Sequence, residues 1–234
     1  RVVAVAGRAK AAARRGRRGG AAAGPAAPGD QTQIIRQVHH MARVAQALKR
    51  AGKTIGFVPT MGALHDGHMS LIRAAHRQTQ VTIVSLFVNP LQFGPNEDYA
   101  RYPRDLTRDL NLAKAGGCEI VFAPDVSQMY PGRCCTYVEV EGLSDRLEGR
   151  LRPGHFRGVA TVVAKLLHLV QPTIAYFGQK DYQQARLIQR MVKDLNFPVT
   201  LRILPTVREP DGLAMSSRNA YLTAEERQHA TVLY

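Results

Sequence analysis

Beyond residue 30, apolar residues recur along the chain at two spacings that alternate. Short, nearly continuous apolar runs predict buried strands, whereas apolar residues three or four positions apart predict amphipathic helices. The predicted strands are Thr54–Pro59, Val81–Val88, Glu119–Ala123, Thr136–Val140, Ile174–Phe177 and Val199–Pro205. The predicted helices are a first one that carries Ile34, Val38, Met41, Ala45 and Leu48 and stops at Gly52, and then Gly67–Arg77, Asp98–Ala115, Val159–Val170 and Tyr182–Leu195.

Strands that alternate with helices predict βαβ crossovers, and hence an α/β fold with a doubly wound, Rossmann-like parallel sheet. Sheets of this kind bind ligands at the carboxyl ends of their strands. We expect three parts along the chain. A disordered Ala/Gly/Arg-rich tail covers residues 1–30, the Rossmann-like domain covers residues 31–205, and a smaller C-terminal domain begins over residues 206–234.

The chain of 234 residues carries 32 Lys and Arg against 18 Asp and Glu, a formal net charge of +14 that is compatible with nucleic-acid binding. The first 30 residues hold seven basic residues and one acid, and the rest of the chain has a net charge of +8. That rest suits an enzyme with anionic substrates equally well. Trp is absent and aromatic residues make up 6%, so bases would find few stacking partners and we expect no nucleic-acid partner.

The cysteine content favours a reducing compartment. Cys118, Cys134 and Cys135 form no CxxC pair, which argues against a disulfide framework and against structural zinc, so we expect a cytoplasmic protein. No apolar run approaches the ~18 residues that a membrane span needs, and we expect no membrane association. The apolar stretch Val2–Ala6 is too short for a secretory signal.

The most informative motif, Pro59–His68, directly follows a predicted strand and opens a predicted helix. His65 and His68 are three residues apart and would share one helix face. A helix N-terminus offers free N–H donors and a partial positive charge to phosphate, and Gly62 and Gly67 allow close approach to the backbone. Two surface histidines that cap a helix would explain an isolated HxxH, but the strand, glycines and helix around them favour a nucleotide site.

Polar residues also follow two other predicted strands, where ligands of such a sheet gather. Asn89 and Gln92 follow one strand, and their amides either bind a substrate's hydroxyl and carboxylate groups or are ordinary loop amides. Gly178 and Lys180 follow another, and they offer backbone N–H groups and a positive charge to phosphate. Asp181 caps the next helix, binds a ribose hydroxyl, or does both.

The sequence HDGH at 65–68 resembles the HxGH signature of the adenylyl-transferring superfamily, which includes class I aminoacyl-tRNA synthetases and small nucleotidyltransferases. The longer block PTMGALHDGHMSLI resembles the pantothenate synthetase (pantoate–β-alanine ligase) family. Further blocks in the family's order are FVNPLQF (87–93), DYARYPRD (98–105), LEGRLRPGHFRGV (147–159), FGQKDYQQ (177–184) and TVREPDGLAMSSRNAYL (206–222). The similarity extends from about Ile34 to Glu226.

The resemblance implies an AMP-forming ligase that condenses (R)-pantoate with β-alanine to pantothenate through a pantoyl-adenylate intermediate, with release of pyrophosphate and AMP. It also implies ATP with Mg²⁺, no dedicated metal-ligating residues, and a homodimer. Family members carry a smaller C-terminal domain that closes over the site, and this chain contains only its beginning. We therefore expect the chain on its own to bind ATP weakly and to turn over poorly.

The resemblance also assigns residues. His65, His68 and Lys180 are implied to be catalytic, with His68 as proton donor at a pKa near neutrality. The residues implied to bind ATP are Met61, Gly62, Ala63, Leu64, His65, Asp66, Gly67, His68, Gly178, Gln179, Lys180, Asp181, Val207, Met215, Ser216, Ser217 and Arg218. The residues assigned to pantoate and β-alanine are Gln92, which is implied to contact both, Gln184, which is implied to contact pantoate, and Asn89 beside them. Tyr102, Glu148 and Arg152 are expected near the site, the last two there or at a subunit interface.

Two other functions stay open at this point. A nucleotidyltransferase of the same superfamily would act on a phosphorylated acceptor, although the blocks NPLQF and KDYQQ after their strands favour the ligase. A basic nucleic-acid-binding module would lose its binding with rising salt and on removal of residues 1–30.

Overall fold

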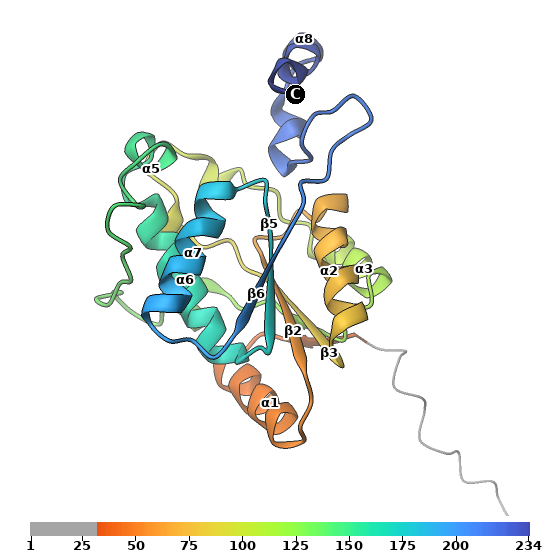
Figure 1. Ribbon diagram of the computed structural model, residues 1–234, viewed down its shortest axis with the longest axis vertical. Helices are drawn as coiled ribbons and strands as arrows, with labels where there is room; N and C mark the ends of the chain where they lie inside the picture. Colours follow the sequence, from red (N-terminus) through yellow and green to blue (C-terminus); the bar gives the residue numbers. More distant parts are fainter. Residues whose placement is uncertain (1–31) are drawn as a thin grey trace, which may run out of the picture. The chain divides into compact units, whose positions relative to one another are not determined.

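A parallel six-stranded sheet is the centre of the computed structural model, which describes residues 32–234 (Figure 1). The tail predicted over residues 1–30 lies outside the described residues. The strands run in the spatial order β1-β4-β3-β2-β5-β6. They are β1 (Gln33–Ile35), β2 (Ile55–Thr60), β3 (Val81–Leu86), β4 (Ile120–Phe122), β5 (Ile174–Gly178) and β6 (Thr200–Leu204). The predicted doubly wound α/β fold is confirmed.

Helices cover both faces of this sheet. Figure 1 shows α2 (Asp66–Gln78) and α3 (Leu106–Ala115) on one face, and α1 (Val38–Arg50), α6 (His155–Val170) and α7 (Tyr182–Asp194) on the other. The shorter elements are α4 (Val126–Met129), α5 (Glu148–Leu151), α8 (Ala224–His229) and the 3₁₀ turns η1 (Pro90–Gln92), η2 (Asp98–Ala100), η3 (Ser217–Tyr221) and η4 (Ala230–Leu233). None of the helices in this part of the chain is both long and apolar enough to cross a membrane.

The strands are apolar on both sides because each face of the sheet is buried under its own helices. Phe57 and Phe177 belong to the hydrophobic core under α1, α6 and α7, whereas their neighbours Val58 and Tyr176 belong to the core under α2 and α3. Successive side chains of a strand point to opposite faces, so a strand buried on both faces loses the alternation of apolar and polar residues.

The order of the strands creates a crevice next to β2. The chain leaves β2 for α2 on one face of the sheet and leaves β5 for α7 on the other, although β2 and β5 are neighbours. The two connections therefore diverge at the carboxyl ends of the strands, which is the point where open α/β sheets bind ligands. The histidine motif follows β2, and Gly178–Asp181 follows β5.

Three predicted helices begin several residues away from the predicted position, and one of them, predicted from Val159, begins at His155 as α6. Ile34 lies in the edge strand β1, and the first helix begins only at Val38. The helix predicted over Asp98–Ala115 is wrong in its first half, because α3 begins at Leu106 and only a short 3₁₀ turn precedes it. Pro103 separates these two elements, and proline disfavours helical backbone in the residue before it.

The strand predicted over Thr136–Val140 is also wrong, because this segment pairs with no strand. Its alternation is nevertheless real: Val138 and Val140 pack against the core, whereas Tyr137 and Glu139 are exposed. The backbone N–H of Val138 donates to Oγ1 of Thr161 on α6, at 3.0 Å. The segment is extended on the surface of a helix, where the apolar and polar alternation of a strand suits it equally well.

Close packing of α6 on η1 predicts that Gly158→Ala destabilises the protein. A Cβ at Gly158 would collide with the backbone carbonyl of Leu91 and approach the Cα of Gln92. Because backbone has to move, we expect a loss of about 1–3 kcal/mol in the free energy of unfolding, measured by urea denaturation. Gly132→Ala is the matched control, since a Cβ there meets open space. Equal stability of the two variants would contradict this packing.

Candidate active site

The connection between β2 and α2 is a tight turn that hydrogen bonds hold in place. The Thr60 hydroxyl donates to the carbonyl of Ser85 on the neighbouring strand at 2.8 Å and accepts from the N–H of Gly62 at 3.1 Å. Gly62 has a φ of +83°, in the left-handed region that favours glycine. The turn thereby reverses the chain directly above the end of β2.

Asp109 of α3 fixes the next two residues of this turn. Its two carboxylate oxygens accept from the N–H groups of Ala63 and Leu64, each at 2.8 Å. Ala63 has a φ of +51°, and an alanine in this region costs roughly 1–2 kcal/mol, which these charge-assisted hydrogen bonds offset. Asp109 is 3% exposed, and burial raises its pKa while the two N–H groups oppose that rise.

Asp109 is not among the predicted site residues, although its position in the helix carries a signal. Asp109 falls on the same helical face as Leu106, Leu110 and Ala113, which pack in the core under α2 and α3. A carboxylate on the apolar face of a helix needs a hydrogen-bonding partner inside the protein. Here the partner is the backbone of the phosphate-site turn.

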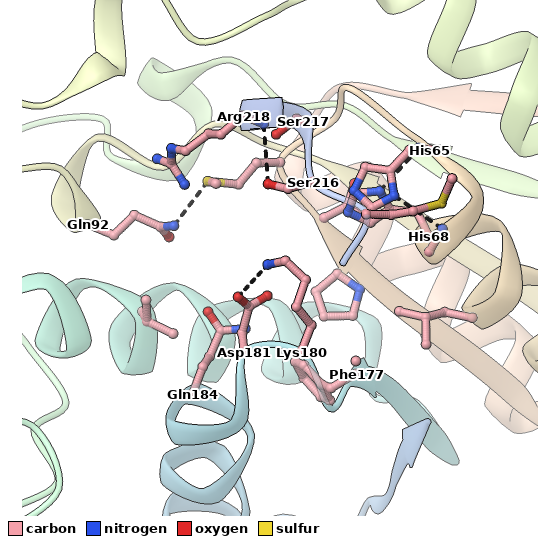
Figure 2. A pocket seen from close by; sticks show the side chains of 18 of the residues that line it. His65, His68, Gln92, Phe177, Lys180, Asp181, Gln184, Ser216, Ser217 and Arg218 are labelled. Carbon is pink, nitrogen blue, oxygen red and sulfur yellow. Dashed lines mark hydrogen bonds and ion pairs between the residues drawn. The ribbon is translucent and has the colours of Figure 1, made fainter. Parts of the chain in front are cut away.

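The two histidines cap α2. His65 is its N-cap residue, and its Nδ1 accepts from the N–H of Gly67 at 3.1 Å. Nδ1 of His68 accepts from the N–H of His65 at 3.3 Å, and the two ring centroids are 4.1 Å apart. A nitrogen that accepts carries no proton, so in each neutral ring the proton lies on Nε2. Both residues line the cavity (Figure 2), to which they bring hydrogen-bond donors.

Burial and charge keep these rings neutral. Desolvation by burial, then His65 and Lys180, lower the pKa of His68 to about 3. Burial and Lys180 likewise lower the pKa of His65. The expectation of a near-neutral pKa for His68 is therefore wrong for the ligand-free protein, because a proton on Nδ1 would break the helix cap and leave a charge desolvated.

Lys180 lies on the connection after β5 and contributes a cation to the cavity. Its Nζ forms an ion pair with Asp181 Oδ1 at 2.7 Å, and Figure 2 shows both across the cavity from the histidines and from Ser216. Asp181 occupies the N-cap position of α7, but its side chain makes no capping hydrogen bond. The interpretation of Asp181 as a helix cap is therefore wrong, because its carboxylate is used by Lys180.

The segment around Ser216–Arg218 closes another side of the cavity. The Ser216 hydroxyl caps η3 by accepting from the N–H of Arg218 at 3.2 Å. The guanidinium of Arg218 pairs with Asp98, with Nη2 2.9 Å from Oδ1. The hydroxyls of Ser217 and Tyr102 are 3.5 Å apart. These contacts attach the segment to η2 and the residues that follow it.

Asn89 and Gln92 differ in their access to the cavity. Asn89 is 1% exposed and does not line it, because its amide donates to Gln92 Oε1 at 3.2 Å and to the carbonyl of Gly158 at 3.1 Å. Its Oδ1 accepts from the Tyr130 hydroxyl at 2.9 Å. Gln92 does line the cavity, and its Nε2 lies 3.0 Å from the sulfur of Met61. Asn89 thus positions Gln92.

The cavity has a volume of about 230 Å³ and opens to solvent at its mouth. The predicted site residues that line it are Met61, His65, Gly67, His68, Gln92, Gly178, Lys180, Asp181, Gln184, Val207, Met215, Ser216, Ser217 and Arg218. Those that do not line it are Gly62, Ala63, Leu64, Asp66, Asn89 and Gln179. Tyr102, Glu148 and Arg152 also line it.

An apolar wall of the cavity was not assigned from the sequence. The residues that form it are Val159, Val162, Val163 and Leu166 of α6 and Phe177 at the end of β5. The sequence predicts an apolar helix at Val159–Val170, and this pattern alone does not show that part of the helix faces a cavity. Among residues 32–234, no three His, Cys, Asp or Glu side chains converge as a metal site.

The clamp on the turn predicts that Asp109→Asn destabilises the protein and weakens nucleotide binding. Asn supplies one acceptor oxygen and places an NH₂ group against the second backbone N–H. Leaving that buried donor unpaired costs about 1–3 kcal/mol in the free energy of unfolding, measured by urea denaturation. Asp194→Asn is the control, since its ion pair with Arg190 is exposed and worth little. A variant at 109 as stable as this control would contradict the clamp.

The depressed pKa of His68 predicts a specific loss of stability in acid. His68 takes up a proton near pH 6.5 in the unfolded chain and only near pH 3 in the folded chain. Its contribution to the free energy of unfolding is therefore complete above pH 6.5 and is lost as the pH falls. When the pH is lowered from 7 to 5, the free energy of unfolding should fall by about 2 kcal/mol less in His68→Gln than in the unmodified protein. His39→Gln, at an exposed site, should behave like the unmodified protein. Parallel pH profiles for all three would refute the depressed pKa.

Comparison with known proteins places this fold and cavity in one family. A family model described as pantoate-beta-alanine ligase matches residues 33–234. The pantothenate synthetase of Moorella thermoacetica is 58% identical over 202 residues, which are 86% of this chain and 71% of that protein. The crystal structure of pantothenate synthetase from Thermus thermophilus superposes with a TM-score of 0.82 at 54% identity, covering 87% of this chain and 72% of that one.

A third relative has been crystallised with ligands. The pantoate-beta-alanine ligase from Francisella tularensis, in complex with beta-gamma ATP and beta-alanine, superposes with a TM-score of 0.81 at 41% identity. That match covers 86% of this chain and 77% of the other. The family similarity expected from the histidine motif and the blocks that follow it is confirmed, and the chain belongs to the pantoate–β-alanine ligase (pantothenate synthetase) family.

Proposed function

We propose that this cavity condenses (R)-pantoate with β-alanine to pantothenate at the expense of ATP. Family membership supports the reaction, and so does the Francisella relative, which was crystallised with beta-gamma ATP and beta-alanine. One observation of the structure carries the assignment to this cavity. Two neutral imidazoles at the start of a helix line the same cavity as Lys180 and Arg218, beside amide side chains that suit an organic acid.

The first step makes a mixed anhydride. A carboxylate oxygen of pantoate attacks the α-phosphorus of ATP, the new O–P bond forms, and the bond from Pα to the bridging oxygen breaks so that pyrophosphate leaves. In our proposal the Nε2–H groups of His65 and His68 donate to phosphate oxygens. Lys180, Ser216 and Arg218 stabilise the negative charge that develops on the leaving pyrophosphate. A carboxylate is already an anion, so this step needs no general base.

The second step uses the activated acyl group. The β-alanine amine attacks the acyl carbon, the C–N bond forms, the bond from carbon to the phosphate oxygen breaks, AMP leaves and the amine loses a proton. The protein contributes mainly position and exclusion of water. We assign Gln92 and Gln184 to pantoate, with its methyl groups against the apolar wall formed by α6 and Phe177.

The other residues predicted to bind ATP have less direct roles in our proposal. Gly62, Ala63 and Leu64 shape the turn that presents the start of α2, although they do not line the cavity themselves. Val207 does line it, and we assign it to the adenine. For Asp66 and Gln179 the assignment to ATP stays a prediction from family resemblance.

Mg²⁺, a homodimer and a cytoplasmic location complete the proposal. The described residues offer no protein cage for a divalent ion, which suits an ion carried by the phosphates of ATP, and no step above depends on it. Leu147 and Leu151 at α5 are 79% and 82% exposed, and we propose that a second copy of the chain covers them. The three cysteines are free thiols, as in a reducing compartment.

The proposed function predicts exchange of pyrophosphate into ATP that requires (R)-pantoate and does not require β-alanine. His68→Ala removes one donor to the transferred phosphate, so the exchange rate should fall by about 10²–10³-fold. His39→Ala, on the exposed face of α1, is the matched control and should leave exchange unchanged. Exchange without pantoate, or full exchange by the variant at 68, would reject the proposal.

A further inference from the structure

One group of charged side chains in the cavity has no role assigned to it so far. Arg152 and Glu148 line the cavity, and so does His155, which is 8% exposed. The charges that act on His155 come from Arg152, Glu148 and Glu97, whereas those that act on His65 come from Lys180, Asp66, Asp181 and Arg108. Arg152, Glu148 and Glu97 therefore surround His155, whereas Lys180 and Asp181 lie near His65.

His155 connects this group of charged side chains to Gln92. Arginine has no acceptor atom, so Nη1 of Arg152 donates to Nε2 of His155, at 3.2 Å. The proton of the imidazole must then lie on Nδ1, which donates to the backbone carbonyl of Gln92 at 2.8 Å. The neutral ring of His155 therefore lies between the guanidinium of Arg152 and Gln92, the residue to which we assign pantoate.

Arg152 has a permanent partner and a displaceable one. Glu97 holds one edge of the guanidinium with both oxygens, and its Oε1 is 2.8 Å from Nε. Glu148 contacts the other edge, with Oε1 2.7 Å from Nη1, but its side chain is 48% exposed against 24% for Glu97. Release of Glu148 to water therefore costs less, and it frees the edge of Arg152 next to His155.

We propose that Arg152 binds the carboxylate of the amine substrate, and that the carboxylate of Glu148 occupies the position of that substrate carboxylate in the ligand-free protein. This inference rests on the proposed function, since it takes the amine to be β-alanine, a short chain with a carboxylate at the far end. Exchange of one carboxylate for another leaves the charge around Arg152 unchanged, so the site is organised before the substrate arrives. Lys180 and Arg218 also line the cavity, and each already has an acidic partner, Asp181 for Lys180 and Asp98 for Arg218.

The test compares two amines in the complete condensation. β-Alanine carries the carboxylate, and 3-amino-1-propanol carries a neutral hydroxyl in its place. The unmodified protein should strongly prefer β-alanine in kcat/KM. Arg152→Gln should lower kcat/KM for β-alanine by about 10- to 100-fold, mainly through KM, and leave the value for the alcohol unchanged. Arg152→Lys should recover part of the loss, because it keeps the charge without the two-pronged contact to Glu97.

Two further variants sharpen the result. Glu148→Gln weakens the internal competitor and should lower the KM for β-alanine severalfold. Arg150→Gln removes an exposed guanidinium from the same short helix and is the matched control. Pantoate-dependent exchange of pyrophosphate into ATP involves no amine, so Arg152→Gln should reduce it far less than it reduces kcat/KM for β-alanine, and Arg150→Gln should leave it unchanged.

The failures of the two proposals are distinguishable. If Arg152→Gln lowers the rates with both amines equally, or abolishes exchange, Arg152 supports the cavity as a whole and the inference is overturned. An increased KM for β-alanine in Glu148→Gln would also overturn it, because Glu148 would then bind the substrate rather than stand in for it. Absence of exchange in the unmodified protein would instead overturn the proposed function.

Discussion

Two backbone N–H groups at the start of α2 are capped by imidazole nitrogens, and this arrangement fixes the chemistry of the phosphate end of the cavity. Because Nδ1 of His65 and of His68 each accept a hydrogen bond, the rings stay neutral and keep their protons on Nε2. Those protons are available to a ligand's oxygens. The turn that places the rings depends on Asp109, which accepts hydrogen bonds from the N–H groups of Leu64 and of Ala63, a residue with positive φ.

The cavity achieves affinity for anions without leaving cations unpaired. Each cationic side chain that lines it has an acidic partner: Lys180 has Asp181, Arg218 has Asp98, and Arg152 has Glu97 and Glu148. In our proposal a substrate carboxylate replaces one of these carboxylates, that of Glu148. Positions of the guanidinium and ammonium groups are set before binding, and the cost of holding long side chains in place is met during folding.

The sequence predicted what depends on local pattern and missed what depends on distant contacts. The alternation of strands and helices follows from residues within one element, and so does the histidine motif after β2. Asp109 is 46 residues from Ala63, and only the packing of α3 beside α2 brings them together. Helix capping by the two histidines was weighed from the sequence as an alternative to a nucleotide site, and the structure shows that they cap the helix and also line the cavity. Thr136–Val140 shows the converse, since the alternation of a strand is satisfied there by the surface of α6.

The central claim is that both imidazoles are neutral, with the proton on Nε2, and it can be measured directly. In ¹⁵N–¹H correlation spectra of the histidine side chains, recorded without ligand, His65 and His68 should show the Nε2–H tautomer at pH 7. The signals of His68 should not change between pH 7 and pH 5, because burial holds its pKa near 3. An Nδ1–H tautomer for either ring, or an imidazolium at His68 by pH 6, would contradict the account.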